Sequence, residues 1–355
     1  MKIVRVECWE IELKLREPYA IAYDRFDTAR QVFLRLETDV RINGFGCAAP
    51  DAHVTGETPG SVLQVLKDVA EPMLHNADPM RWVWLLERLA QEMNGHAAAL
   101  AAVDMALHDI LAKVGQLPLW KLLGGYRERM LTSVTIGILP EAETVAKAKD
   151  LVRQGFKRLK LKGGLDVESD IVRAIKVREA VGEEIGLCFD ANQGFTLEAA
   201  LHFLEHTQAI QFEFIEQPLP REQTELLGFV KKQARTPVMA DESLITLADL
   251  KYLVRHELVN LINLKLQKVG GIAVARKMIA GAEMAGIPAM VGCMDEAALP
   301  IAAGLHFALA QPNVRYADLD GHFDLLGDPT HAAILFHDGF LIPNDQPGLG
   351  WNPRE

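Results

Sequence analysis

Short apolar runs that end in a charged or small residue recur at a nearly constant interval through the last two thirds of this chain. Their candidate ends fall at eight positions: Ile138, Lys162, Asp190, Glu216, Asp241, Lys265, Gly292 and Asp318. From the second position onward the intervals are 28, 26, 25, 24, 27 and 26 residues, the length of one strand, one helix and two connections. Eight such units predict an α/β fold, a TIM-type (β/α) barrel, whose active site gathers at the carboxyl ends of the strands.

The beginning of the chain follows a different pattern. Alternating polar and apolar residues predict two antiparallel strands, at about 2–14 and 31–37, followed by a turn at Asn43-Gly44. Residues 16–29, between these strands, are expected to form a loop that is long enough to serve function.

Helical periodicity follows over residues 61–93 and 96–115. Because 355 residues exceed the length of a single barrel, we predict an α+β capping domain over residues 1–125 and a catalytic barrel over residues 126–325. The tail, residues 326–355, has lost the repeat and is expected to pack back onto the capping domain.

The composition excludes several classes of protein. A net charge of -11 and a pI near 5.5 argue against nucleic acid or an anionic membrane as a partner. The four cysteines lack a CxxC spacing, which gives no sign of a zinc site or a disulfide framework. The N-terminus lacks the apolar core of a signal peptide, and no run of about 18 apolar residues is present. We expect a cytoplasmic protein, and a homo-oligomer is compatible with the sequence.

Three of the strand ends carry a carboxylate. Asp190, Glu216 and Asp241 follow successive apolar runs, LCFD, FEFIE and VMAD. Each carboxylate could simply cap the next helix, but capping does not require that three successive strands all end in a carboxylate. Ligands that are all oxygen select a hard cation, so we predict a Mg²⁺ site here, with Mn²⁺ as a possible occupant.

Lysines lie on the strands that flank these acids. In RLKLKGG, the period of two places Lys160 and Lys162 on one strand face, directed into the barrel. Two neighbouring ammonium groups are expected to lower at least one pKa and so to favour a neutral amine base. A cluster of solvated lysines is the alternative. Lys265 lies across the barrel, and Lys268, three residues later, is a rival base that we expect in the following loop.

This order of charges predicts a proton transfer. A substrate held on the metal would present opposite faces to Lys162 and Lys265, so one lysine could remove a proton beside a carboxylate and the other could return one. The metal and the ammonium groups would stabilise the enediolate that forms.

Two weaker motifs complete the pattern. Asp318 and Asp320, in the DLD at the eighth strand end, could bind a cation such as an α-ammonium group, although a hydrated loop is the alternative. Gly270-Gly271 could cradle a phosphate at a helix N-terminus or could form a tight turn between strand and helix.

The ordered motifs KLK, FDAN, IEQP, ADES and NLKLQKVGG resemble the enolase superfamily, in its muconate lactonizing enzyme subgroup. The resemblance covers nearly the whole chain and implies a modified barrel with an N-terminal capping domain. Lysine bases with Mg²⁺ are a known property of this superfamily.

Within the subgroup, the DLD motif is similar to that of dipeptide epimerases. The likeness implies that Asp318 and Asp320 hold the amino terminus of a dipeptide, and that Lys162 and Lys265 are the acid/base pair. It also implies that Lys160 stabilises the enolate. Three further residues are expected to line the substrate pocket by the same likeness: Thr135, Cys293 and Asp295.

One position departs from the enzymes that act on Ala-Glu. Where those have a basic residue, this chain has Asp24, and Asp295 makes the pocket more acidic. We therefore predict a preference for dipeptides with a basic or polar second residue. The alternatives are muconate cycloisomerisation or o-succinylbenzoate synthesis on the same lysine and metal core, and a barrel that binds without catalysis because its site is vestigial.

Overall fold

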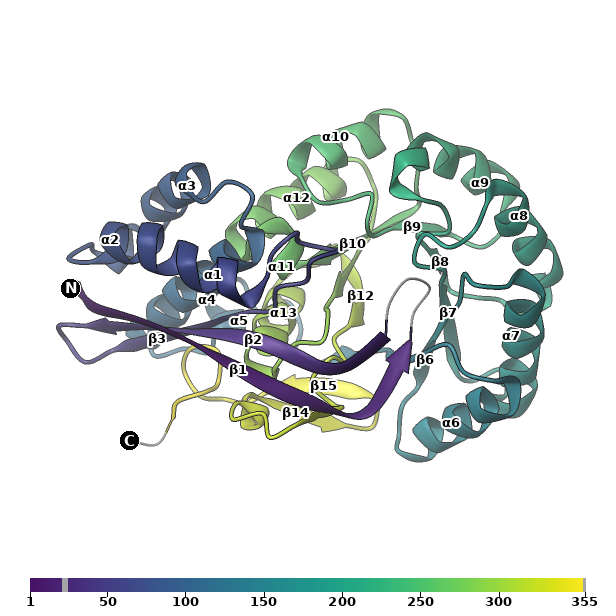
Figure 1. Cartoon of the computed structure of the whole chain (residues 1–355), viewed down its shortest axis with the longest axis horizontal. Coiled ribbons are helices and arrows are strands. Elements are labelled where there is room, and N and C mark those ends of the chain that lie inside the picture. Colours follow the sequence, from purple (N-terminus) through teal and green to yellow (C-terminus); the bar gives the residue numbers. More distant parts are fainter. Residues whose placement is uncertain (21–24, 354–355) are drawn as a thin grey trace.

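The structure is a computed structural model that describes residues 1–20 and 25–353. These residues form a four-stranded sheet, an eight-stranded sheet and a three-stranded sheet. Figure 1 shows the helices of the N-terminal part on one side of the molecule and the barrel with its surrounding helices on the other, while the long strands of the first sheet extend from one to the other. The predicted combination of a parallel barrel with an antiparallel capping sheet is confirmed.

The capping sheet is built on two long strands, β1 (Ile3–Ala20) and β2 (Arg25–Thr38). They pair antiparallel, with β3 (Asn43–Ala48) on the far side of β2. The predicted loop over residues 16–29 is wrong for the described residues, because β1 extends to Ala20 and β2 begins at Arg25. The register shifts between Lys14 and Tyr19, and this irregularity interrupts the alternation on which the shorter strand prediction rested.

The turn between β2 and β3 also differs from the prediction. It lies before Asn43, where Thr38 Oγ1 donates to the carbonyl of Ile42 and accepts from its N–H, at 2.8 and 3.1 Å. Gly44 has another role. A Cβ at this position would lie 2.2 Å from the carbonyl oxygen of Ala106, so glycine allows β3 to pack directly against the long helix behind it.

Helices cover one face of the capping sheet. They are α1 (Pro59–Val65), the π-helical η1 (Leu66–Ala70), α2 (Glu71–Leu74), the 3₁₀-helical η2 (Pro79–Arg81), α3 (Trp82–Glu92), α4 (Ala97–Val114) and α5 (Leu119–Leu122). The predicted helix over residues 61–93 is therefore broken. The break follows α2, where Asn76 takes a left-handed conformation with φ of 63°.

The barrel strands run parallel and in sequence order. They are β5 (Val134–Ile136), β6 (Arg158–Lys162), β7 (Gly186–Asp190), β8 (Ile215–Glu216), β9 (Val238–Ala240), β10 (Leu261–Lys265), β11 (Ala289–Gly292) and β12 (Val314–Asp318). Thr132, just before β5, bridges to Ala317 on β12 and brings the two edges of the barrel together. The predicted strand ends hold to within two residues.

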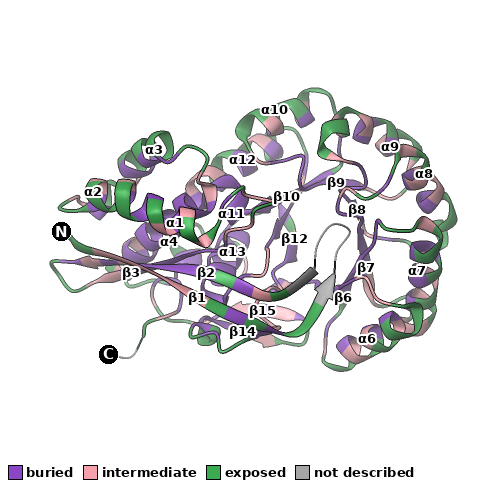
Figure 2. Cartoon of the chain, in the orientation of Figure 1, coloured by how far each residue is buried: buried purple, intermediate pink, exposed green. Residues whose placement is uncertain are grey.

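Helices surround the barrel, with buried inner faces and exposed outer faces (Figure 2). They are α6 (Glu141–Arg153), α7 (Val167–Val181), α8 (Leu197–His206), η3 (Gln208–Ile210), η4 (Arg221–Leu226), α9 (Leu227–Gln233), α10 (Leu247–Arg255), α11 (Leu266–Val269), α12 (Ile272–Met284) and α13 (Ala298–Ala310). Three begin at a side-chain cap, from Asp166, Thr196 and Thr246.

Gly270 and Gly271 form a tight turn between α11 and α12, with φ of 89° and 104°. Asp104, from α4 of the capping region, accepts hydrogen bonds from the N–H groups of Ile272 and Ala273 at 2.6 and 3.2 Å. A carboxylate of this chain thus occupies the helix N-terminus where a phosphate was considered.

The tail contacts both the capping region and the segment that precedes the first barrel strand. Its elements are β13 (Leu325–Leu326), η5 (His331–Ala333), β14 (Ile334–His337) and β15 (Phe340–Pro343). β13 pairs with β1, and β15 pairs with β4 (Met130–Leu131). Further on, the N–H of Leu349 donates to Asp109 on α4 at 2.8 Å.

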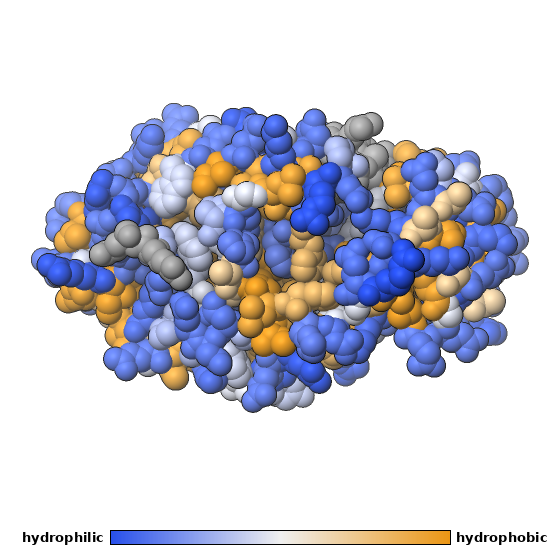
Figure 3. Space-filling model, turned by 90° about the horizontal axis from the view of Figure 1, so that it is seen from below, coloured by the Kyte–Doolittle hydropathy of each residue, from blue (hydrophilic) through white to orange (hydrophobic). Residues whose placement is uncertain are grey.

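The described helices include none long and apolar enough to cross a membrane. Polar side chains cover most of the face seen in Figure 3, and apolar side chains form smaller areas between them.

Candidate active site

A cavity of about 440 Å³ lies at the carboxyl ends of the barrel strands, between the barrel and the capping sheet. The capping sheet contributes residues from β1 and β2, including Leu15 and Gln31, and the loop after β3 contributes Asp51. Gln31 Nε2 donates to the carbonyl of Asp295, in the loop after β11, at 2.8 Å. The two sheets therefore enclose one cavity.

The strand register brings the predicted site residues to one level of the barrel. Lys162 lies beside Asp190, and Asp190 lies beside Glu216 on β8. On the opposite side, Lys265 aligns with Gly292, which aligns with Asp318 on β12. This alignment follows from parallel pairing of strands that end at equal intervals.

Three lysines and three carboxylates form what we call the lysine–carboxylate centre: Lys160, Lys162, Lys265, Asp190, Glu216 and Asp241. Lys162 Nζ lies 2.7 Å from Asp190 Oδ2, and Lys265 Nζ lies 2.8 Å from Asp241 Oδ2. All six residues are buried. Buried charges are tolerated only when they are paired, and here each is close to an opposite charge.

The donor set of the three acids suits a hard cation, because it consists of carboxylate oxygens alone. Burial, opposed by Lys160 and Lys265 and reinforced by Asp190 and Asp241, raises the pKa of Glu216 to about 8. A cation held by these groups would relieve that repulsion. Within residues 1–20 and 25–353, no three acidic, His or Cys side chains are arranged closely enough to hold a metal as they stand; Lys160 Nζ lies within 3.5 Å of both Asp190 and Glu216.

The prediction of a lowered lysine pKa is wrong for Lys160. Burial alone would lower the pKa of this side chain, but Asp318, Glu216 and Asp190 raise it well above its ordinary value. Lys162 is only one of the charged neighbours of this ammonium group. Three other strands place carboxylates around it, and their effect on the pKa outweighs that of the second lysine.

Lys265 and Lys268, the two candidate bases near the end of β10, lie in different surroundings because the short helix α11 begins between them. Lys265, at the end of β10, lines the cavity. Lys268 lies in α11 and not in a loop, is almost fully buried, and donates to Asp241 Oδ1 and, at 2.6 Å, to the carbonyl oxygen of the same residue. Its ammonium group therefore supports Asp241 from outside the cavity, while Lys265 faces the space where a substrate would lie.

The DLD motif also faces the cavity. Asp318 accepts hydrogen bonds from Lys160 and from Ser133 Oγ, and these partners lower its pKa although burial opposes them. Asp320 accepts from the backbone N–H of Thr135 at 2.6 Å and from Cys293 Sγ at 3.7 Å. Burial, with a smaller contribution from the neighbouring charge of Asp318, raises the pKa of Asp320 to about 6.

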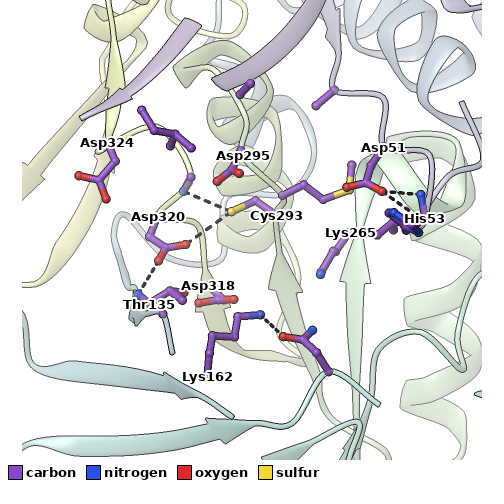
Figure 4. A pocket seen from close by; sticks show the side chains of 18 of the residues that line it. Asp51, His53, Thr135, Lys162, Lys265, Cys293, Asp295, Asp318, Asp320 and Asp324 are labelled. Atoms are coloured by element: carbon purple, nitrogen blue, oxygen red, sulfur yellow. Dashed lines mark hydrogen bonds between the residues drawn. The ribbon is translucent and has the colours of Figure 1, made fainter. Parts of the chain in front are cut away.

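Three further acidic residues line the cavity, and Asp295 among them is a predicted pocket residue. Figure 4 shows Asp51, Asp295 and Asp324 on the side opposite Lys162, and all of them line the cavity. Asp51 accepts from the backbone N–H of His53 at 2.8 Å. Asp24 lies outside the described residues.

Sequence reasoning did not single out two buried residues of this site. Asn192, two residues after Asp190, accepts a hydrogen bond from Lys162 at 2.8 Å. Glu242, directly after Asp241, accepts from Asn192 at 3.2 Å. Asn192 is the last residue of the motif FDAN, and Glu242 is the third residue of the motif ADES. Their positions just beyond two predicted strand ends could have indicated that they belong to the site.

The fold and the site define a class. Residues 143–355 match the family of enolase C-terminal domain-like proteins, and residues 3–124 match the N-terminal domain of mandelate racemase and muconate lactonizing enzymes. The chain belongs to this family of the enolase superfamily and, within it, to the dipeptide epimerases, which are isomerases.

Individual relatives extend over the full length of the chain. An L-Lys-D/L-Arg epimerase of Desulforapulum autotrophicum is 40% identical over 99% of both chains. A Methylococcus capsulatus dipeptide epimerase, solved with Mg and L-Arg-D-Lys, has a TM-score of 0.95 at 38% identity, covering 99% of both chains. The substrate-liganded L-Ala-D/L-Glu epimerase of Bacillus subtilis has a TM-score of 0.96 at 34% identity, covering 99% of this chain and 98% of that one.

Proposed function

We propose that this protein epimerises a dipeptide at the α-carbon of its C-terminal residue, by a two-base reaction in which one lysine removes the α-proton and another lysine returns a proton to the opposite face. One observation carries the proposal. Lys162 and Lys265 line the same cavity from β6 and β10, with the three acid-bearing strands between them. Two bases on opposite sides of one carbon are the arrangement that inversion of a stereocentre requires.

The proton balance is simple. One lysine, as a neutral amine, takes the α-proton while the C–H bond breaks and its electron pair moves into the adjacent carboxylate. The other lysine, as an ammonium group, donates a proton to the opposite face of the planar carbon. Asp190, Glu216 and Asp241 would hold Mg²⁺, which would stabilise the negative charge that develops on the substrate carboxylate.

Asp318 and Asp320 are proposed to bind the α-ammonium group of the dipeptide. They lie at the β12 side of the cavity, and Lys160 holds Asp318 in place. A carboxylate pair is a suitable partner for an ammonium group. The substrates of muconate cycloisomerase and o-succinylbenzoate synthase have no ammonium group, so this pair favours a dipeptide over both alternatives.

The lining of the cavity supports a basic second residue. Outside the lysine–carboxylate centre, Glu242 and the Asp318–Asp320 pair, the described lining carries five acidic residues, one histidine, His53, and two basic residues. The acidic residues are Glu17, Asp51, Glu57, Asp295 and Asp324. Of the basic pair, Arg30 and Lys147, the second is already paired with Glu17 at 2.6 Å. The L-Lys-D/L-Arg epimerase relatives add support for cationic dipeptides.

A library of L,L-dipeptides incubated with the protein and Mg²⁺ in deuterated buffer tests the proposal. Mass spectrometry should show a gain of one mass unit, at the C-terminal residue, and the fastest exchange for dipeptides with Lys or Arg second. Fastest turnover of dipeptides with Glu second would contradict the specificity. Exchange with no dipeptide, together with conversion of muconate or of the o-succinylbenzoate precursor, would contradict the reaction.

A further inference from the structure

Two side chains form a hydrogen-bonded chain that ends at one lysine of the proposed proton-transfer pair. Lys162 Nζ donates to Asn192 Oδ1 at 2.8 Å, and Asn192 Nδ2 donates to Glu242 Oε1 at 3.2 Å. The three residues are at most 9% exposed. We infer that Asn192 and Glu242 are positioning residues that hold Lys162 for proton transfer, an inference that rests on the proposed function.

The chemistry of the three groups gives the chain a single direction. An ammonium group only donates hydrogen bonds, and a carboxylate only accepts them. With Lys162 as an ammonium group and Glu242 as a carboxylate, the amide of Asn192 turns its oxygen to Lys162 and its nitrogen to Glu242. The reversed amide would place N–H groups against the ammonium and an oxygen against the carboxylate. Glu242 thus fixes the orientation in which Asn192 supports Lys162.

The backbone at Asn192 is shaped for this contact. Its φ is 42°, in the left-handed region, where asparagine is one of the few residues without a large penalty. Its N–H donates to Asp190 Oδ1 at 2.9 Å. The left-handed turn directly after β7 thereby directs the amide toward Lys162 on the neighbouring strand.

The buried position of the Glu242 carboxylate lowers the stability of the folded protein. Its Oε2 has no hydrogen-bond partner among the described residues, although the side chain is 8% exposed and lines the cavity. A buried, unsatisfied carboxylate oxygen destabilises the folded state, and an apolar side chain would fill the space at lower cost. The contact with Asn192 supplies a reason for a carboxylate at this position.

The support is one-sided. Lys162 contacts both Asp190, a proposed metal ligand, and Asn192, which is not one. Lys265 contacts the proposed ligand Asp241, and in residues 1–20 and 25–353 no side-chain amide donates to it or accepts from it. Loss of the Asn192 contact should therefore impair proton transfer on the Lys162 face alone.

Hydrogen wash-out from separate diastereomers measures each face. Exchange of the α-hydrogen with deuterated water requires only the lysine that faces it, and Lys162→Ala identifies the diastereomer that faces Lys162. Asn192→Gly keeps the left-handed backbone and removes the amide. It should slow wash-out from that diastereomer by about 10- to 100-fold, the cost of a misplaced catalytic group, and from the other by about threefold or less.

Two variants of Glu242 separate orientation from charge. Glu242→Gln retains an oxygen that can accept from Asn192 and should keep the wild-type ratio of the two wash-out rates. Glu242→Leu should lower the ratio in the same direction as Asn192→Gly. Gln193→Ala is the matched control, because this neighbouring amide accepts from the N–H of Arg221 instead, and it should leave the ratio unchanged. Thermal unfolding of each variant confirms that it is folded.

The outcomes separate the two claims. Equal slowing of both diastereomers in folded Asn192→Gly, or no slowing of either, would overturn the positioning role. If the wild-type protein exchanges neither diastereomer of any dipeptide, the proposed function itself fails.

Discussion

The two ends of the barrel interior are filled in opposite ways by residues of the same strands. At the amino-terminal end, five buried apolar or sulfur-containing side chains pack together: Cys188, Phe214, Met239, Leu261 and Met290. On β7, Cys188 precedes Asp190 by two residues, and on β10, Leu261 precedes Lys265 by four. Because strand side chains alternate, these pairs share the inward face.

This difference divides stability from function. The apolar end gains free energy from burial and close packing. The charged end incurs a desolvation cost that its ion pairs offset only in part. Because such groups are expensive to bury, their presence at the carboxyl ends of the strands is best explained by the chemistry that they perform.

The largest expected effect is loss of either lysine that faces the cavity. Lys162→Ala or Lys265→Ala should lower the rate of epimerisation by about 10²- to 10⁴-fold, the usual contribution of a general acid or base. Lys157→Ala is the matched control, since this exposed lysine pairs with Asp338 at the surface. Polarimetry or chiral chromatography of the product measures the rates, and a Lys162→Ala enzyme with wild-type turnover would contradict the proposed role.

The opposite end of the barrel should respond in stability. Phe214→Ala removes a fully buried ring and should lower the free energy of unfolding by about 3–5 kcal/mol. Phe229→Ala, where the ring is 46% exposed, should change it by about 0.5 kcal/mol or less. Urea denaturation measures both. Similar losses in the two variants would mean that the apolar layer is not the source of stability.

Metal binding should stabilise the folded protein through the charged end. At a Mg²⁺ concentration about 100 times Kd, the free energy of unfolding should rise by about 2.7 kcal/mol. Glu216→Gln should reduce this gain, whereas Glu213→Gln, which alters the salt bridge with Arg158 at the other end of the barrel, should retain it. Thermal unfolding at constant ionic strength measures the shift; an equal gain in both variants would place the metal elsewhere.

The smallest effect, about 1.4 kcal/mol for each pH unit, comes from a buried histidine. His306 is fully buried, its Nδ1 accepts from the N–H of Trp120 at 2.9 Å, and burial lowers its pKa to about 3. An unfolded histidine titrates near pH 6.5. The unfolded state thus binds the extra proton between these values, so stability is complete above about pH 6.5 and falls as the pH drops toward 3.

His306→Asn retains an acceptor for Trp120 and removes the titration. The dependence of unfolding free energy on pH between 6 and 4 should become shallower by about 1.4 kcal/mol per pH unit, the value of one proton. An unchanged slope would show that His306 is already protonated in the folded state, like the paired charges of the barrel.

The barrel and its charged end were predictable because strand period and repeat length are local properties. Lys162, Asp190 and Asp241 each fall at a strand end that the sequence marks, and parallel pairing then brings these ends to one level. The capping strands were less predictable. The shift in register after Lys14 depends on pairing with β2, and alternation along a single strand does not report it.

The positions of Asn192 and Glu242 depend on contacts between elements. Each follows a predicted metal ligand, but the amide must bridge from β7 to both β6 and β9 before its role is visible. The raised pKa of Lys160 has the same origin, because its carboxylate neighbours come from β7, β8 and β12. Sequence spacing predicts which strands neighbour one another, and side-chain directions decide which groups pair.

Hydrogen exchange in the two lysine variants tests the two-base arrangement most directly. Each variant is incubated with Mg²⁺ and, separately, with the L,L and the L,D form of the best dipeptide in deuterated water, and proton NMR follows the α-hydrogen. Lys162→Ala should exchange only one diastereomer and Lys265→Ala only the other, because each retains one base on one face. Exchange of the same diastereomer by both variants would contradict the account.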